Sequence, residues 1–167
     1  CSSYTGNMGC SGGTMDNAFM YVVQNGLCLN SSYPYSALDG QCNNQTCEKK
    51  VHVDTFYDVP KNDETQVERA VAKQPVSVAI QANLQSFQLY SHGIYNDPEC
   101  GDELDHGVLV VGYGYDPLYN MSYWLVKNSW GSQWGENGYI RMAKNIESPE
   151  GQCGIAMDAS YPRIKYH

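Results

Sequence analysis

The sequence lacks three features that would direct it to other classes of protein. No apolar run approaches the roughly 20 residues needed to cross a bilayer, and no internal repeat or low-complexity tract occurs. Basic residues are scarce, with 10 Lys and Arg against 18 Asp and Glu and a formal net charge of -8. Because phosphate backbones bind basic surfaces, we expect no nucleic-acid partner, and equally no membrane partner. With 42% hydrophobic and 17% charged residues, the composition is typical of a globular protein.

Cysteine, in contrast, is abundant. Seven cysteines in 167 residues favour an oxidising compartment with disulfides. They do not form two Cys-x-x-Cys pairs, so we expect no structural zinc, and no other metal or cofactor. An odd number leaves one thiol that is free, reactive or bonded outside this chain. Three Asn-x-Ser/Thr sequons, at Asn30, Asn44 and Asn120, fit a secretory route and a glycoprotein.

Helix and loop signals dominate the first half of the chain. Residues 1–13 and 28–50 are rich in polar, Gly and Asn residues and are predicted to be loops. Between them, apolar residues at i, i+3, i+4 and i+7 predict a helix that begins near Met15 and ends at Gly26. A second helix is predicted to start at Asp63 to Gln66 and to stop before Pro75.

Strand signals dominate the second half. β-Branched and aromatic residues bounded by Gly, Pro or Asn predict strands over residues 76–82, 107–113, 122–127 and 138–143. This separation of helix from sheet predicts an α+β protein with two subdomains meeting near Asp58.

One histidine is placed for chemistry. His106 follows an acidic stretch and opens the apolar strand from Gly107, a rigid position from which a base can serve an active site. The alternative is a histidine at the edge of the core. The other three histidines lie in polar surroundings or at the chain end and are interpreted as surface residues: His52, His92 and His167.

A segment dense in Trp and Gly follows that strand. Trp130 and Trp134 stand four residues apart among glycines, and Asn128 precedes them. The tryptophans could simply fill the core. They could also exclude water from a hydrogen bond by which Asn128 fixes the ring of a catalytic histidine, which would strengthen that bond.

These segments together resemble papain-like cysteine proteases of the papain and cathepsin L type. Residues 104–107 and 128–131 are similar to the histidine and asparagine segments of the family. Further matching segments occur in the family's order over essentially the whole chain, at residues 9–13, 32–35, 74–78, 153–156 and 161–162. The resemblance implies the papain-like two-domain fold. Residues 1–57 would be the remnant of its helical left domain, and residues 58–167 its β-barrel-like right domain with a C-terminal strap.

The resemblance also implies roles for individual residues. His106 would be the general base and later the acid, paired with a cysteine thiolate. Asn128 would orient His106, with Trp130 and Trp134 as supporting residues. Gly12 and Gly13 would let an extended substrate backbone approach closely. The remaining residues implied in substrate binding are Thr14, Met15, Ala79, Leu104, Asp105 and Asp158.

The family's nucleophile is not found in the sequence. It lies in a Cys-Gly-Ser-Cys-Trp type motif on the order of 130 residues before the histidine, which is roughly 25 residues before Cys1. No Cys-Trp pair occurs in this chain, and the oxyanion-hole glutamine is also absent. We therefore interpret the chain as a fragment that lacks its N-terminal segment and is inactive alone.

Disulfide partners follow from the same resemblance. Cys100 would pair with Cys153, and Cys1 with Cys42 or Cys47. Cys28 would bond whichever of Cys42 and Cys47 remains, and Cys10 would bond the absent segment.

The implied function is a lysosomal, vacuolar or secreted cysteine endopeptidase. By the same resemblance, its pocket for the residue two before the cut would lie between Met15, Ala79, Leu104 and Asp158. It would accept apolar side chains, and basic ones if Asp158 lies at its base rather than in solvent. Expected partners are peptide or protein substrates, cystatin-type inhibitors, the protein's own propeptide and, through Cys10, its absent segment. The alternative is a non-catalytic homologue that binds peptides or serves a structural role.

Overall fold

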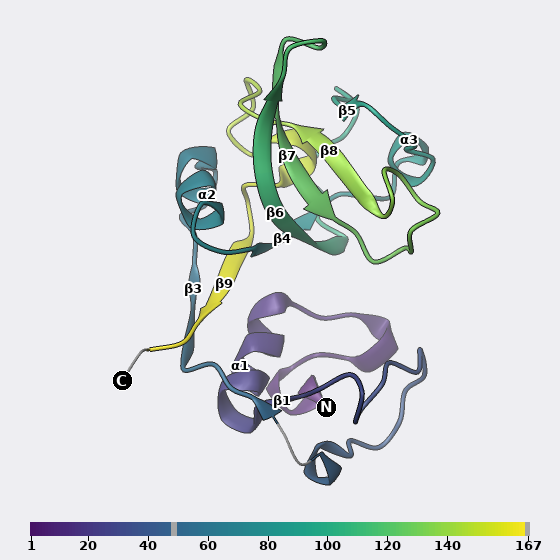
Figure 1. Cartoon of the computed structure of the whole chain (residues 1–167), viewed down its shortest axis with the longest axis vertical. Helices are drawn as coiled ribbons and strands as arrows, with labels where there is room; N and C mark the ends of the chain where they lie inside the picture. The colour runs from purple at the N-terminus through teal and green to yellow at the C-terminus, as the bar shows by residue number, and fades with distance from the viewer. Residues whose placement is uncertain (48–49, 166–167) are drawn as a thin grey trace. The chain divides into compact units, whose positions relative to one another are not determined.

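The computed structural model describes residues 1–47 and 50–165, which form two compact units (Figure 1). The first unit is Cys1–Tyr57 together with the chain from Pro162 onward, and the second is Asp58–Tyr161. No helix in the described residues is long and apolar enough to cross a membrane.

The first unit is built on one helix. α1 spans Met15–Asn25; the Thr14 side chain accepts a hydrogen bond from Asn17 N at its start, and Gly26 caps its end. The predicted helix is therefore present with its predicted limits. The expected loops contain short 3₁₀ turns at Ser2–Thr5, Gly9–Ser11 and Asn44–Thr46, and a two-stranded sheet of β1 (Leu27–Cys28) and β2 (Lys50–Val51).

The C-terminal residues group with the first unit, although the sequence analysis assigned them to the second domain. Arg163 O accepts a hydrogen bond from Asp54 N, and Lys165 N donates to the Asp54 carboxylate. The Arg163 guanidinium also lies over the Tyr57 ring. These contacts join segments more than a hundred residues apart in the sequence. A local sequence pattern cannot predict such contacts.

The second unit is mainly sheet. Its elements are α2 (Glu64–Val71), β4 (Val76–Ile80), α3 (Gln85–Gln88), β5 (Ile94–Tyr95), β6 (His106–Asp116), β7 (Met121–Lys127) and β8 (Tyr139–Ala143). With β3 (Thr55–Asp58) and β9 (Ala159–Arg163), which cross the boundary between the units, the sheet order is β3-β9-β4-β6-β7-β8-β5. Five elements were not predicted as such: β3, α3, β5 and β9, and the 3₁₀ turn Gln152–Gly154.

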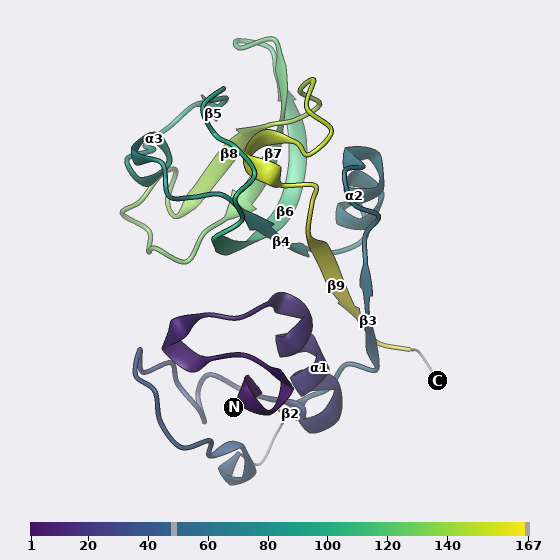
Figure 2. The same cartoon turned by 180° about the vertical axis from the view of Figure 1, so that it is seen from behind.

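Alternating burial places one face of this sheet in the core. Val76, Val78 and Ile80 of β4 are buried while Ser77 and Ala79 between them are half-buried, as the two-residue period of a strand requires. Antiparallel β6 and β7 form a long hairpin that projects beyond the rest of the unit, visible from both sides (Figures 1 and 2). The opposite end of this hairpin carries the candidate site.

Candidate functional site

His106 is the first residue of β6 and lies beside β4. Its register partner is Ile80 on β4. The preceding residue, Asp105, donates its backbone N–H to Ile80 O over 3.0 Å, and its carboxylate accepts the Ala82 N–H over 2.7 Å. The Asp105 side chain thus fixes the backbone that leads into His106.

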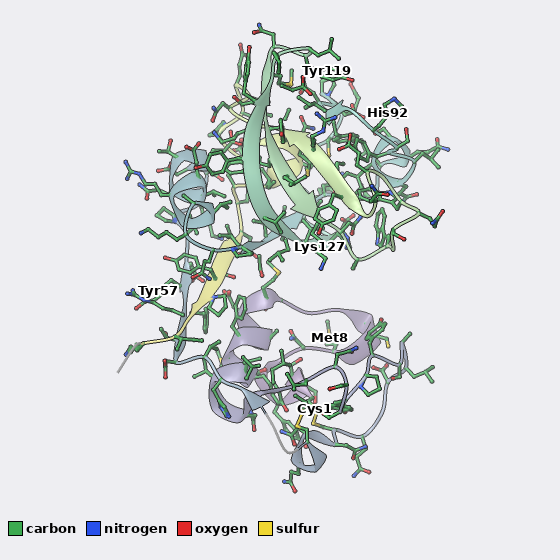
Figure 3. The ribbon with its side chains drawn as sticks, viewed as in Figure 1. Cys1, Met8, Tyr57, His92, Tyr119 and Lys127 are labelled. Carbon is green, nitrogen blue, oxygen red and sulfur yellow. A yellow bond between two sulfur atoms is a disulfide. The ribbon has the colours of Figure 1, made fainter. Side chains whose placement is uncertain are left out.

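Asn128 directly follows β7, whose last residue, Lys127, is labelled in Figure 3. Because β6 and β7 are antiparallel neighbours, the start of β6 lies beside the end of β7. His106 Nε2 is 2.8 Å from Asn128 Oδ1. Asn128 is only 8% exposed, and its backbone N–H donates to Gly138 O over 3.0 Å. The structure therefore joins the two residues that the sequence analysis singled out.

A second contact determines which nitrogen of His106 carries the proton. Ser129 N–H donates to Asn128 Oδ1 over 2.7 Å. A backbone N–H can only donate, so the Asn128 atom that it meets is the carbonyl oxygen. The same oxygen faces His106 Nε2, which must then be protonated and donate. The lone pair of the neutral ring is consequently on Nδ1, the nitrogen free to accept a proton.

Trp130 stacks on the imidazole. The ring centroids of His106 and Trp130 are 5.0 Å apart with 29° between their planes. Trp130 remains 41% exposed, so it covers one face of the histidine while its own outer face meets solvent. An indole in this position limits access of water to the imidazole and to its bond with Asn128.

The supporting aromatic residues include one that the sequence analysis missed. Phe87 is fully buried on α3. Its ring centroid lies 5.7 Å from that of Trp130, in an edge-to-face arrangement, and 5.4 Å from that of Trp134, in a tilted arrangement. Trp134 in turn contacts Trp130 at 5.2 Å and donates its indole N–H to Gln88 O over 3.0 Å. Phe87 therefore forms the floor beneath Trp130. A one-turn helix with a single buried residue has no periodicity from which it could have been predicted.

An ion-pair network holds the end of the loop that joins β7 to β8. The Glu136 carboxylate accepts hydrogen bonds from Arg141 Nε at 2.9 Å and Nη2 at 2.8 Å, and from Gly93 N at 3.0 Å. Hydrogen bonding to Arg141 holds the pKa of Glu136 below its ordinary value, and the same bond raises the pKa of Arg141. Arg141 Nη1 also pairs with Asp116 at 2.6 Å. Burial raises the pKa of the neighbouring Tyr90 to about 12, which keeps its hydroxyl protonated as a donor to Gly93 O.

Three of the residues expected in the specificity pocket belong to the second unit. Ala79 N donates to Asp158 O over 3.0 Å, and Ala79 is the register partner of Gly107, next to His106. Leu104 precedes β6 and lies against Gly154. All three are half-buried: Ala79, Leu104 and Asp158.

The remaining predicted substrate-binding residues belong to the first unit. Gly12 has a φ of 99°, and a Cβ there would meet nothing within 4 Å, so its backbone is open to approach. At Gly13 a Cβ would lie 2.1 Å from Asn7 Oδ1, which accepts the Thr14 N–H over 2.9 Å. Thr14 caps α1, and Met15 begins that helix and is half-buried.

The cysteines resolve the pairings that the sequence left open. Disulfides join Cys1 to Cys42, Cys28 to Cys47, and Cys100 to Cys153. Cys10 is an exposed free thiol whose backbone N–H donates to Asp39 Oδ1 over 2.8 Å. Desolvation, the largest cause, and the neighbouring Asp39 carboxylate raise the pKa of the Cys10 thiol above its ordinary value.

Other candidate groups do not contribute a site. His52 and His92 are exposed, and His167 lies outside the described residues. No group of three or more His, Cys, Asp or Glu side chains within the described ranges could hold a metal ion.

Comparisons with known proteins agree with this geometry. Residues 1–163 match the model of the papain family cysteine proteases. The chain is 53% identical over 158 residues to a probable cysteine protease, RD21B, of Arabidopsis thaliana, covering 93% of this chain and 34% of the relative. It is also 53% identical over 167 residues to a cathepsin L of Sarcophaga peregrina, covering 98% of this chain and 48% of the relative.

A solved structure gives the same result for the fold. The bromelain protease of Ananas comosus, in complex with the E64 inhibitor, matches with a TM-score of 0.91 and 42% identity, over 96% of this chain and 74% of that one. The chain spans about a third to a half of the length of the two relatives above. It has the papain-like α+β fold and belongs to the papain family of cysteine proteases.

Proposed function

We propose that the whole protein is a cysteine endopeptidase in which His106 is the general base and acid and Asn128 orients it. The observation that carries the proposal is the hydrogen bond of 2.8 Å between His106 Nε2 and Asn128 Oδ1 beneath the stacked Trp130 ring. A histidine that only filled the edge of the core would need neither a buried amide nor an indole cover.

The mechanism follows from the position of the proton. His106 Nδ1 takes the proton of a cysteine thiol, and the resulting imidazolium stays bound to Asn128 Oδ1 through Nε2–H. The thiolate attacks the scissile carbonyl, and His106 returns the proton to the leaving amine. Water then releases the acyl group with His106 again acting as base.

The nucleophile comes from residues that precede Cys1. None of the seven cysteines in this chain is followed by Trp, as the family motif requires. The relatives are two to three times longer than the matched region, which leaves room for such a segment. Cys10, exposed and unpaired within the described residues, is the thiol that would bond it. The chain alone is then inactive.

The substrate pocket is formed in part by Ala79, Leu104 and Asp158. Leu104 offers an apolar wall, the small Ala79 leaves space, and Asp158 would attract a basic side chain. We expect the enzyme to cleave peptides that carry Leu or Arg as the second residue before the scissile bond. Replacing Asp158 with Ala should raise the Leu/Arg ratio of kcat/KM, whereas an unchanged ratio would remove Asp158 from the pocket.

For Gly12, Gly13, Thr14 and Met15, substrate binding is supported by the family resemblance and by the open backbone at Gly12. Peptides and proteins are the proposed substrates, and the propeptide and cystatin-type proteins the proposed inhibitors. Three disulfides and three sequons support an oxidising destination, either lysosome or vacuole or the extracellular space.

The deciding experiment uses the full-length protein, purified with all residues that precede Cys1. Peptide hydrolysis that iodoacetamide abolishes, and that His106→Ala removes while leaving folding intact, would support the endopeptidase. Correctly folded full-length protein without thiol-dependent hydrolysis would instead establish the alternative, a non-catalytic peptide-binding homologue.

A further inference from the structure

The β6–β7 hairpin ends in a sequon that the proposed catalytic machinery does not use. The hairpin turn occupies residues 117–120, and Asn120-Met121-Ser122 forms the acceptor triplet. Tyr119, labelled in Figure 3, lies in this turn, at the opposite end of the hairpin from Lys127. A group attached at the turn would therefore project away from the candidate site within this unit.

The local geometry leaves the acceptor atom available. Asn120 is exposed and has a φ of 50°, a left-handed conformation that Asn tolerates better than most residues. The Tyr115 hydroxyl donates to Asn120 Oδ1. This contact uses the carbonyl oxygen of the side-chain amide and not its nitrogen, and it can persist when the nitrogen carries a sugar.

The sequon at Asn44 is arranged in the opposite way. Its amide nitrogen donates to the Tyr21 hydroxyl over 2.7 Å, and Tyr21 is buried. The surrounding segment is closed by the disulfides Cys1–Cys42 and Cys28–Cys47. A sugar on this nitrogen would take the place of the tyrosine contact in a segment that the disulfides prevent from moving away.

The hairpin turn also exposes apolar surface that a glycan would cover. Leu118 is 85% exposed, Tyr115 57% and Tyr119 46%. Three apolar side chains are thus exposed within five residues, and exposed apolar surface promotes association between molecules. A hydrated oligosaccharide on Asn120 would stand beside these side chains.

From these contacts we propose that Asn120 is an N-glycosylation site of this protein and that Asn44 is not. The donor is an oligosaccharide linked through a diphosphate to a lipid. The Asn120 amide nitrogen forms a bond to the anomeric carbon of the first sugar, the bond from that carbon to phosphate breaks, the nitrogen loses one proton, and the lipid diphosphate leaves. The inference rests on the secretory route included in the proposed function.

The test uses native protein purified from its source. Release of N-glycans by an amidase in heavy-oxygen water converts each occupied Asn to Asp bearing one heavy oxygen, which peptide mass spectrometry locates. We expect the label at Asn120 and not at Asn44; Asn30, which is also exposed, is scored in the same digest as an internal reference. An unlabelled Asn120, or a labelled Asn44, would overturn the inference.

Variants of the full-length protein expressed in a eukaryotic secretory host give a second readout. Asn120→Asp keeps a residue that tolerates the left-handed backbone and removes the acceptor, and Ser122→Ala removes the sequon hydroxyl. Both variants should migrate faster on a gel, by the shift expected for the loss of one glycan. Ser122→Thr and Asn44→Gln should migrate as the parent does. Thiol-dependent hydrolysis is measured on the same samples. Activity without a glycan on Asn120 refutes only this inference, and a glycan without activity refutes only the proposed protease.

Discussion

His106 Nε2 and Asn128 Oδ1 lie 2.8 Å apart, and the Ser129 N–H that shares the same oxygen makes Asn128 an acceptor toward the histidine. The orientation of one side-chain amide thereby assigns the two nitrogens of the imidazole to different tasks: Nε2 is held and Nδ1 is left to exchange a proton.

Replacement of Asn128 tests this division of tasks. In the full-length protein, Asn128→Ala should leave His106 present but free to rotate and to change tautomer. We expect kcat/KM to fall by about 10²-fold, the lower end of the range for general acid–base catalysis.

Asn96, an exposed asparagine in the same unit, provides the matched control. Asn96→Ala should leave kcat/KM unchanged. If Asn128→Ala lowered stability but not the rate per folded molecule, the residue would be structural, and the orienting role would be lost.

Trp130 should contribute to activity through its ring rather than through a hydrogen bond. Trp130→Phe preserves an aromatic face over His106, and Trp130→Ala removes it and uncovers Phe87. We expect the alanine variant to lose more activity than the phenylalanine variant and about 1 kcal/mol of additional stability, the magnitude of an aromatic pair. Equal kcat values for the two variants, measured beside their denaturation midpoints, would contradict a shielding role.

Much of the second unit could be predicted because its burial repeats locally. The alternation of Val76, Val78 and Ile80 identifies β4 without knowledge of its neighbours. β9 was not predicted: Ala159–Arg163 begins with small residues and contains Pro162, and it becomes a strand because Ser160 pairs with Ser77 of β4. Tertiary pairing, and not propensity, determines such an element.

The candidate site likewise has one part that the sequence predicts and one part that it does not. The residue types of His106 and Asn128 could be identified from sequence, but their contact depends on the register of β6 against β7. That register shifts between Val110 and Gly112, where an irregularity inserts one extra residue. No periodicity reveals such a shift, which moves one strand end by about 3.3 Å relative to the other.

Gly13 is constrained by a single neighbour in the first unit. A Cβ at this position would lie 2.1 Å from Asn7 Oδ1, so Gly13→Ala must displace the side chain that accepts the Thr14 N–H. We expect Gly13→Ala to lower stability by about 1 kcal/mol, the net value of one hydrogen bond. A Cβ at Gly13 would also lie 2.8 Å from the Asn7 Cβ, so Asn7→Gly is needed to clear the space, and adding Gly13→Ala to Asn7→Gly should cost less than it does alone.

Thermal denaturation of the two single variants and the double variant measures this coupling. Strictly additive losses would show that Asn7 does not limit the space at Gly13. Gly40, an exposed glycine whose Cβ would meet nothing within 4 Å, serves as the control position for alanine substitution.

The pair of Glu136 and Arg141 should make the stability of the second unit dependent on pH. Hydrogen bonding to Arg141 lowers the pKa of Glu136 in the folded state. The folded protein therefore binds the proton of Glu136 less tightly than the unfolded chain does. Its contribution is therefore fully present above the unfolded pKa, which is about 4.3, and is lost as the pH falls through the lower folded value.

Glu136→Gln removes the charge and keeps an acceptor for Arg141 and Gly93. At neutral pH we expect this variant to be less stable than the parent by about 1.5 kcal/mol, the value of a hydrogen bond to a charged group. The difference should begin to shrink as the pH falls below about 4.3 and should approach zero only below the lowered folded pKa, where the parent also carries a neutral side chain. Denaturation midpoints of parent and variant across this range measure the effect, with the exposed Glu147→Gln as control. A difference that stayed constant with pH would mean that Glu136 acts by packing, and that its charge does not hold the loop between Asn128 and Tyr139 in place.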